Sequence, residues 1–112
     1  MKPASMSHFL AAVLAMASFG AFAADHHEAT LVIQGHRFVP AEMKVPAGRK
    51  IKLTVLNNDA SPEEFESYEL NREKVVAGNG RIIVFVGPLR PGRYPYFGEF
   101  HMDTAKGTLI AE

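Results

Sequence analysis

Gly, Pro and Asn divide the sequence into short β-like runs, and this division limits the fold more than any other feature. The clearest run is "KIKLTVLN", in which Ile51, Leu53 and Val55 alternate with polar residues. Such alternation is typical of a half-buried strand. Comparable runs are "ATLVIQ", "RIIVFV", "GRYPYF" and "GTLIA". No helical period exceeds about two turns, so we predict an all-β, antiparallel β-sandwich of roughly seven to eight short strands.

The predicted core consists of apolar residues within these runs. No repeat or linker separates the runs, which favours a single domain. The inward-facing candidates are Leu31, Ile33, Phe38, Val45, Ile51, Leu53, Val55, Ile83, Phe85, Tyr94, Leu109 and Ile110.

The first 23 residues have the pattern of a secretory signal peptide. Lys2 precedes an apolar run from Phe9 to Ala17, and "AFA" at 21–23 is a cleavage site of the A-x-A type. The apolar run is shorter than the roughly 20 residues of a membrane span; a retained membrane anchor is the alternative. We therefore predict a signal peptide at 1–23 and an exported domain at 24–112.

Composition excludes several functions. The chain has no Cys, which removes zinc-finger, iron–sulfur, thioredoxin-like and Cys-nucleophile chemistry. Without the signal peptide, eleven basic side chains face twelve acidic ones. This balance gives no electrostatic case for binding nucleic acid or an anionic membrane.

Acidic side chains gather in two segments. "SPEEFESYE" holds four Glu and no basic residue, and in it Glu64 and Glu66 are two positions apart. On a strand, that spacing puts both on one face. Glu99 and His101 repeat the spacing in "GEFHMDTAKG". A cation would relieve the repulsion between the acids, so this clustering is a first sign of a cation site.

These residues also have simpler interpretations. Glu64 and Glu66 would then form a solvated strand face paired with Arg72 or Lys74, Glu99 would cap a turn, and His101 would be an ordinary surface histidine. Two further acids, Glu69 and Glu73, are assigned to surface or supporting pairs outside the metal site. His36 is assigned to a structural or exposed position.

A separate copper site at the start of the mature chain is a hypothesis that depends on the cleavage position. Cleavage after Ala23 would leave a free amine on Ala24, followed by Asp25 and His26. An amine, two deprotonated amides and a third-position imidazole form a square-planar nitrogen set that suits Cu²⁺ or Ni²⁺. A polar leader without bound metal is the alternative.

The order of these landmarks resembles the cupredoxin family. "FVPAEMKVPAGRKIKLTVLNND" is similar to the opening half of a cupredoxin, and "PGRYPYFGEFHMDTAKGTLI" is similar to its closing half. The resemblance implies a cupredoxin-like Greek-key sandwich. It also implies that the two segments carrying the acids lie side by side at one end of the sandwich. With the resemblance, we predict a metal site formed by Glu64, Glu66, Glu99 and His101.

The same resemblance argues against a blue-copper centre. Blue-copper sites use two His, one Cys and a weak axial Met. Laid on this sequence, the Cys position falls at Gly98, the Met position at about Ala105 and the upstream His position at Glu63. Only His101 matches, so no thiolate copper site is expected. Carboxylate and imidazole favour Fe²⁺, Fe³⁺, Mn²⁺ or Cu²⁺ over Cu⁺.

"EFESYELNREK" and "FGEFHMDTAKG" resemble the small exported cupredoxin component (FtrB-like) of Ftr-type ferrous-iron uptake systems. More distantly, they resemble the cupredoxin domain of EfeO-type proteins. The resemblance implies a periplasmic copper- or iron-binding protein that helps to oxidise Fe²⁺ before uptake. It implies as partners a periplasmic iron-binding protein and an inner-membrane iron permease. A Cys in the closing loop of the EfeO-type domain is missing here, so a copper–thiolate contribution is not expected.

Two other functions fit the sequence. One is a periplasmic copper or iron carrier without turnover, and the other is an adaptor built on a cupredoxin scaffold that has lost its metal. Ferroxidase-like turnover is therefore left open. Hydrolase chemistry has no support, because no Ser/His/Asp set is suggested.

Overall fold

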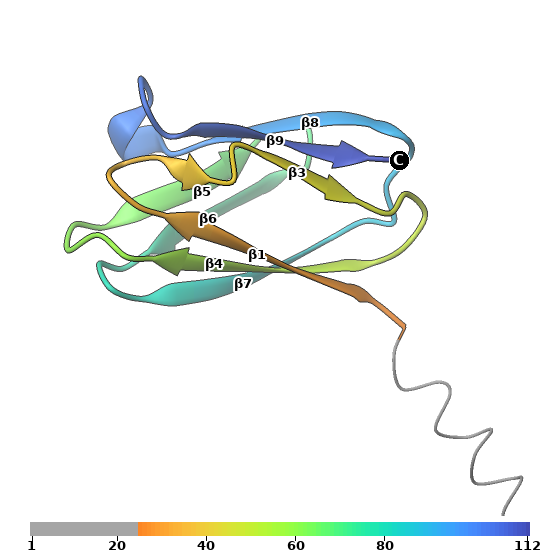
Figure 1. Cartoon of the computed structure of the whole chain (residues 1–112), viewed down its shortest axis with the longest axis horizontal. Coiled ribbons are helices and arrows are strands. Elements are labelled where there is room, and N and C mark those ends of the chain that lie inside the picture. The colour runs from red at the N-terminus through yellow and green to blue at the C-terminus, as the bar shows by residue number, and fades with distance from the viewer. Residues whose placement is uncertain (1–24) are drawn as a thin grey trace, which may run out of the picture.

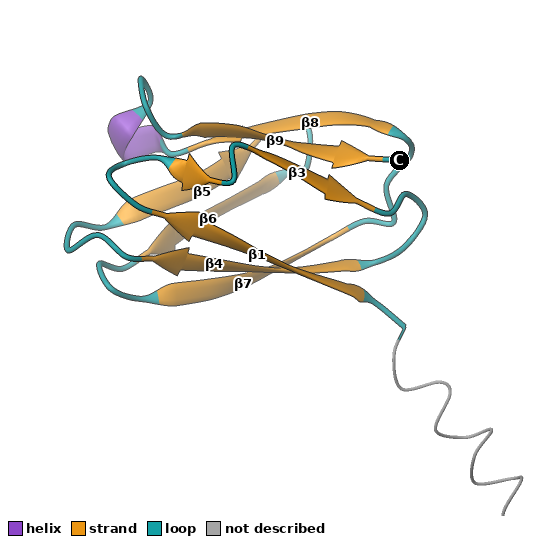
Figure 2. Cartoon of the chain, in the orientation of Figure 1, coloured by secondary structure: helices purple, strands orange, loops and turns teal. Residues whose placement is uncertain are grey.

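The computed structural model describes residues 25–112, which form a sandwich of two β-sheets (Figures 1 and 2). One sheet has the strand order β2-β1-β4-β7 and the other has the order β3-β9-β8-β5-β6. The elements are β1 (His27–Ile33), β2 (Phe38–Val39), β3 (Glu42–Val45), β4 (Ile51–Asn57), β5 (Glu63–Ser67), β6 (Arg72–Val76), β7 (Arg81–Val86), β8 (Gly92–Phe97), the short 3-10 helix η2 (Glu99–His101) and β9 (Lys106–Ala111).

The predicted all-β sandwich is confirmed, with two differences of detail. Both sheets are mixed, because β1 pairs in parallel with β4 and β3 in parallel with β9. The chain crosses to the opposite sheet between the members of each parallel pair, and alternation along one strand carries no information about such crossings. The described residues also contain nine strands, because β2 is a separate element of two residues.

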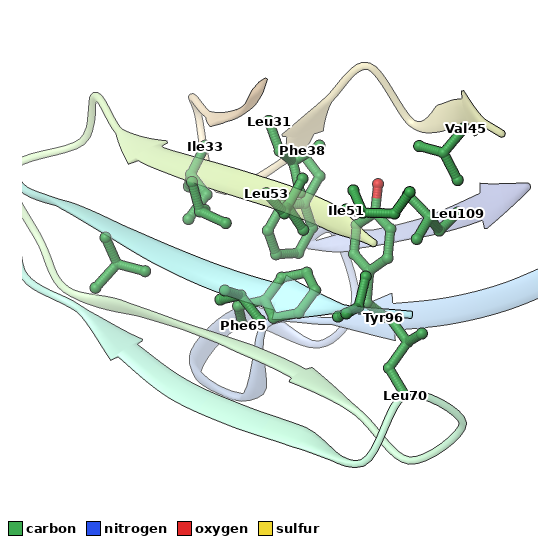
Figure 3. Close-up of a cluster of buried hydrophobic side chains, with 14 of the residues drawn as sticks. Leu31, Ile33, Phe38, Val45, Ile51, Leu53, Phe65, Leu70, Tyr96 and Leu109 are labelled. Atoms are coloured by element: carbon green, nitrogen blue, oxygen red, sulfur yellow. The ribbon is translucent and has the colours of Figure 1, made fainter. Parts of the chain in front are cut away.

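The core lies between the two sheets (Figure 3). Leu31, Ile33, Phe38, Val45, Ile51, Leu53, Val55 and Leu109 are buried there as predicted. Sequence reasoning missed other members of the core, namely Phe65, Leu70, Val76, Val84, Val86, Tyr96, Ala105 and Ala111.

Four predicted core residues are wrong or only partly right. Phe85 is 45% exposed, and Ile83 and Ile110 are half-buried. Tyr94 is half-buried and packs against the edge of the core. The run "RIIVFV" is apolar at every position after Arg81, so its alternation could not show which face is buried.

Three connections lie together at one end of the sandwich: the β1–β2 loop, the β4–β5 loop and η2 (Figure 1). The Asn57 side chain donates to the Ser61 carbonyl at 2.9 Å within the β4–β5 loop. Asp59 in the same loop accepts hydrogen bonds from the amides of Gly35 and His36, both at 2.9 Å. These bonds hold His36 in the left-handed region at φ 59° and fix the β1–β2 loop beside η2.

Candidate metal-binding sites

Strand β5 carries acids on both of its faces at this end of the molecule. Glu63, Phe65 and Ser67 point toward the core, and all three are buried. Glu64 and Glu66 lie on the opposite face, as the spacing of two predicts. The register places Glu66 directly opposite Glu73 of β6. Two neighbouring clusters result, one on each face of the strand.

The carboxylate cluster consists of Glu64, Glu66, Glu73 and Glu99. Each offers a carboxylate oxygen, and these oxygens lie within 4.8 Å of one another. Glu64 is buried, Glu66 half-buried, and Glu73 and Glu99 are exposed. Like charges facing each other across a strand pair are destabilising, so the cluster is unfavourable while all four groups are ionised.

No basic side chain in residues 25–112 forms a salt bridge with this cluster. Arg72, which sequence reasoning offered as a partner for Glu64 or Glu66, donates instead to the carbonyls of Phe85 at 3.0 Å and Asn71 at 2.8 Å. The interpretation as a salt-bridged strand face is therefore wrong for Arg72 and Lys74.

Glu64 has the most unusual environment in the cluster. It is only 6% exposed, and its Oε1 atom has no hydrogen-bond partner within the described residues. Burial, the largest cause, and the neighbouring carboxyl groups of Glu99, Glu66 and Glu73 together raise the pKa of Glu64 to about 8. One protonated carboxyl group would relieve the repulsion, because it carries no charge and can donate a hydrogen bond to a neighbouring carboxylate. A cation would supply the missing positive charge in place of that proton.

The histidine–carboxylate cluster, on the core-facing side of β5, consists of His36, Glu63 and His101. One ligand atom from each lies within 4.8 Å of the others. His101 Nδ1 is 2.6 Å from Glu63 Oε2. The rings of His36 and His101 are stacked, with centroids 3.7 Å apart and planes inclined at 25°.

The four predicted ligands do not converge on one point. Glu64, Glu66 and Glu99 come together, joined by Glu73, but His101 is not among them and pairs with Glu63 instead. Glu99 and His101 lie on the 3-10 helix η2, which has three residues per turn. Residues two apart on such a turn point in different directions, so the strand argument fails there.

Sequence reasoning missed three members of the two clusters. Glu73 was assigned outside the site, although its position opposite Glu66 becomes evident once β5 and β6 are paired. His36 was assigned to a structural or exposed position; it is half-buried and stacks on His101. Glu63 was aligned with the upstream His of blue-copper proteins, but it was not predicted to be a ligand itself.

The place of a thiolate copper centre is filled by Glu63. A Cβ atom built on Gly98 would lie 2.6 Å from both Cδ and Oε1 of Glu63, and 2.9 Å from the Cβ of Ala105. The Glu63 carboxylate therefore occupies the space that a side chain at 98 would need. Its Oε1 accepts hydrogen bonds from the backbone amides of Glu64 at 2.9 Å and Phe100 at 3.1 Å. The residues present do not fit a Cys–His–Met copper site.

The predicted amino-terminal copper site falls partly outside the described residues, because Ala24 is not among them. The His26 ring packs edge-on against Phe85, with centroids 6.5 Å apart. The beginning of β1, which follows His26, lies at the opposite end of the sandwich from η2 (Figure 1). Within residues 25–112, no helix has the length and apolar character needed to cross a membrane.

The two-sheet topology, with both clusters at one end, places the molecule in the cupredoxin-like class of β-sandwiches. The chain belongs to the cupredoxin-like domain family, whose profile matches residues 7–111. It is also 46% identical over 83 residues to an uncharacterized protein of Rickettsia prowazekii (strain Madrid E). That match covers 74% of this chain and 66% of the Rickettsia protein, slightly less than two thirds of its length.

Solved structures with the same fold include copper proteins. Auracyanin A, a "blue" copper protein from Chloroflexus aurantiacus, superposes with a TM-score of 0.65 and 16% identity, over 76% of this chain and 98% of auracyanin. Amicyanin from Paracoccus versutus gives 0.59 and 18%, over 80% and 83% of the two chains. A purple cupredoxin from Nitrosopumilus maritimus gives 0.58 and 18%, over 75% and 99%. At these identities the likeness establishes the fold alone.

Proposed function

We propose that this protein binds Fe²⁺ at the carboxylate cluster and assists ferrous-iron uptake by favouring oxidation of the ion before transport. One observation carries the proposal. Within residues 25–112, the buried Oε1 of Glu64 has no hydrogen-bond partner, and it lies among three further carboxylates to which no basic side chain is salt-bridged. A buried acid without a partner is costly, and a divalent cation is the partner that this set of oxygens suits.

The donor set also accounts for the direction of the redox chemistry. Anionic oxygen stabilises Fe³⁺ more than Fe²⁺, because the higher charge gains more from hard ligands. The potential of the bound iron is thereby lowered, and Fe²⁺ gives up one electron more readily. Dioxygen or a bound Cu²⁺ would accept that electron. Mn²⁺, which prefers the same oxygen ligands, is expected to bind without being oxidised.

The cellular setting is part of the proposal. The signal-like segment at 1–23 and the resemblance to the Ftr-type and EfeO-type proteins support export to the periplasm. The same resemblance supports cooperation with a periplasmic iron-binding protein and an inner-membrane iron permease.

A carrier without turnover is the second candidate, and the exposure of the cluster favours it. Glu73 and Glu99 are exposed, so a bound ion would reach solvent and could pass to a partner. The two functions differ in stoichiometry. Oxidation of many Fe²⁺ ions per protein in air indicates turnover, whereas uptake of one ion per chain without further oxidation indicates a carrier.

Metal titration of the exported protein with Fe²⁺ under anaerobic conditions, and with Mn²⁺, tests the binding. Glu64→Gln keeps the size of the side chain and removes its charge. We expect this variant to weaken Fe²⁺ and Mn²⁺ binding at least about tenfold. Glu69→Gln changes an exposed acid of the same segment outside the cluster, so it should bind as the parent does. Equal affinities for the parent and Glu64→Gln would exclude the carboxylate cluster as the iron site.

A further inference from the structure

The histidine–carboxylate cluster has no part in the iron role proposed above. We infer that His36, Glu63 and His101 form a second metal site, specific for a borderline divalent ion such as Cu²⁺. The site would stand where a thiolate centre is lost, but with different donors. Glu63 takes the space left by Gly98, and His36 is contributed by the β1–β2 loop.

The distance between Glu63 and His101 already suits a shared ion. Metal–nitrogen and metal–oxygen bonds of about 2.0–2.2 Å place adjacent ligand atoms roughly 3 Å apart. His101 Nδ1 and Glu63 Oε2 are 2.6 Å apart, so a metal could replace the proton between them after an opening of a few tenths of an ångström. This nitrogen and this oxygen are the first two donors.

His36 supplies the third donor and has freedom to move onto the ion. Its side chain is 44% exposed, and its Nδ1 atom is 3.7 Å from Asp59 Oδ2, too far for a hydrogen bond. Its ring stacks on that of His101, with the centroids 3.7 Å apart. Its backbone, by contrast, is anchored by Asp59. A fixed backbone with a partly exposed ring keeps the imidazole beside the other donors and leaves room for it to turn toward an ion.

The surroundings of Glu63 aim one oxygen at the site. Oε1 is occupied by the two amides of Glu64 and Phe100, which leaves Oε2 as the donor. The side chain is 2% exposed, so water does not compete for it. Hydrogen-bonded support of this kind orients a ligand and strengthens metal binding.

The donor set selects the ion. Two imidazoles and one carboxylate suit Cu²⁺, Zn²⁺ or Fe²⁺ better than Mg²⁺ or Ca²⁺, and among first-row divalent ions Cu²⁺ binds such sets most tightly. The carboxylate cluster offers oxygen alone. The two faces of β5 therefore present ligand sets of different character, joined through the adjacent residues Glu63 and Glu64 and through η2, which carries Glu99 and His101.

Cu²⁺ titration, followed by electron paramagnetic resonance, tests the site. The parent for this experiment is the exported chain carrying His26→Gln, which removes the imidazole of the predicted amino-terminal site. We expect one Cu²⁺ per chain, with nitrogen couplings from two imidazoles and without an intense thiolate charge-transfer band.

Substitutions assign the donors. His36→Gln should weaken Cu²⁺ binding at least about tenfold and remove one nitrogen coupling, and His101→Gln should have a larger effect. His27→Gln, at the opposite end of the sandwich, is the matched control. His36 makes no side-chain hydrogen bond that the fold needs, so His36→Gln should fold normally, with an unchanged circular dichroism spectrum.

The inference is overturned if His36→Gln and His101→Gln both bind Cu²⁺ as the parent does, since the cluster would then only be a hydrogen-bonded contact between β5 and η2. An unchanged spectrum in His36→Gln alone also overturns the three-donor site. The outcome is separate from that of the iron proposal. Glu64→Gln should leave the Cu²⁺ spectrum intact, and His36→Gln should leave Mn²⁺ affinity, which reports on the all-oxygen carboxylate cluster, intact.

Discussion

At the scale of single residues, Glu63 and Glu64 are adjacent buried acids whose carboxylates differ in their hydrogen-bond partners. Both are less than 10% exposed. Glu63 has two amide donors and an imidazole around its carboxylate, whereas Oε1 of Glu64 has no hydrogen-bond partner among the described residues. Hydrogen bonds to an ionised group compensate its burial. The burial of Glu63 is therefore compensated within the fold, whereas that of Glu64 is not compensated by any group in residues 25–112.

The raised pKa of Glu64 predicts a stability that depends on pH. Its folded pKa of about 8 lies above the ordinary value of 4.5, so the folded state holds a proton that the unfolded state releases. The resulting stability is fully present below about pH 4.5 and is lost as the pH rises toward 8. In chelator, the melting temperature of the parent should fall over this range, and Glu64→Gln should flatten the fall. Parallel melting curves for Glu64→Gln and the parent would contradict the assignment; Glu69→Gln, as control, should follow the parent.

The contact between Gly98 and Glu63 predicts a coupled pair of substitutions. Gly98→Ala forces the Glu63 carboxylate away from its donors and should cost about 1–3 kcal/mol of unfolding free energy. Glu63→Ala leaves buried amides unpaired and should cost about 2–4 kcal/mol. The double variant should cost at least about 1 kcal/mol less than the sum, because removing Glu63 removes the clash.

Urea denaturation of the four proteins measures this coupling. Gly92→Ala is the matched control, because a Cβ at position 92 meets its nearest atom at 3.7 Å and should change stability by less than about 0.5 kcal/mol. Additive costs for Gly98→Ala and Glu63→Ala would show that the carboxylate does not fill the space at Gly98.

At the scale of elements, the sequence correctly predicted which side chains share a face of a strand, and this reasoning failed where the element is not a strand. Alternation in β4 correctly identified Ile51, Leu53 and Val55 as buried, and the spacing of Glu64 and Glu66 correctly placed them on one face of β5. The same spacing failed for His101, because η2 is not a strand.

Other parts of the site depend on which elements become neighbours. The pairing of β5 with β6 brings Glu73 opposite Glu66. The folding of the β1–β2 loop against η2 brings His36 onto His101. Neither contact leaves a local signal in the sequence, since its partners are separated by loops whose paths depend on the whole sandwich.

The β1–β2 loop provides a prediction at this scale through Asp59. Its carboxylate accepts two amides from that loop, and the hydrogen bond from the His36 amide is the main cause that lowers the pKa of Asp59. A lowered folded pKa gives stability that is present above the ordinary value of 3.8 and lost as the pH falls below it. Asp59→Asn should cost about 1–2 kcal/mol at pH 7 and reduce this acid-side loss.

Amide hydrogen exchange at Gly35 and His36 checks the same prediction directly. Both amides should exchange faster in Asp59→Asn than in the parent, because their acceptor is weakened. Asp103→Asn, in an exposed turn, is the control and should leave these amides protected. Unchanged protection in Asp59→Asn would mean that the loop is held by other contacts.

At the scale of the whole molecule, a cupredoxin-like sandwich brings three distant positions together at one end. Gly98 lies against both Glu63 and Ala105, and these are the positions that the resemblance aligns with blue-copper ligands. The scaffold therefore fixes where the donors stand, and the side chains decide which ion they suit. The absence of Cys moves the chemistry from thiolate toward oxygen and imidazole.

This view predicts that three substitutions rebuild a thiolate copper centre. Glu63→His removes the carboxylate that fills the pocket, Gly98→Cys supplies the thiolate, and Ala105→Met supplies a weak axial ligand beside His101. The triple variant with Cu²⁺ should show an intense visible charge-transfer band, which the parent lacks. Ala105 is fully buried, so the added methionine should cost about 1–3 kcal/mol of stability.

The matched control replaces Gly98→Cys by Gly98→Ser in the same triple background. Serine has nearly the same shape but provides no thiolate, so this protein should bind Cu²⁺ without the band. A folded Gly98→Cys triple variant that binds Cu²⁺ with the spectrum of its serine counterpart would show that the three positions no longer share a coordination sphere. In that case the positions of the donors, as well as their residue types, would differ from those of a blue-copper protein at this end of the sandwich.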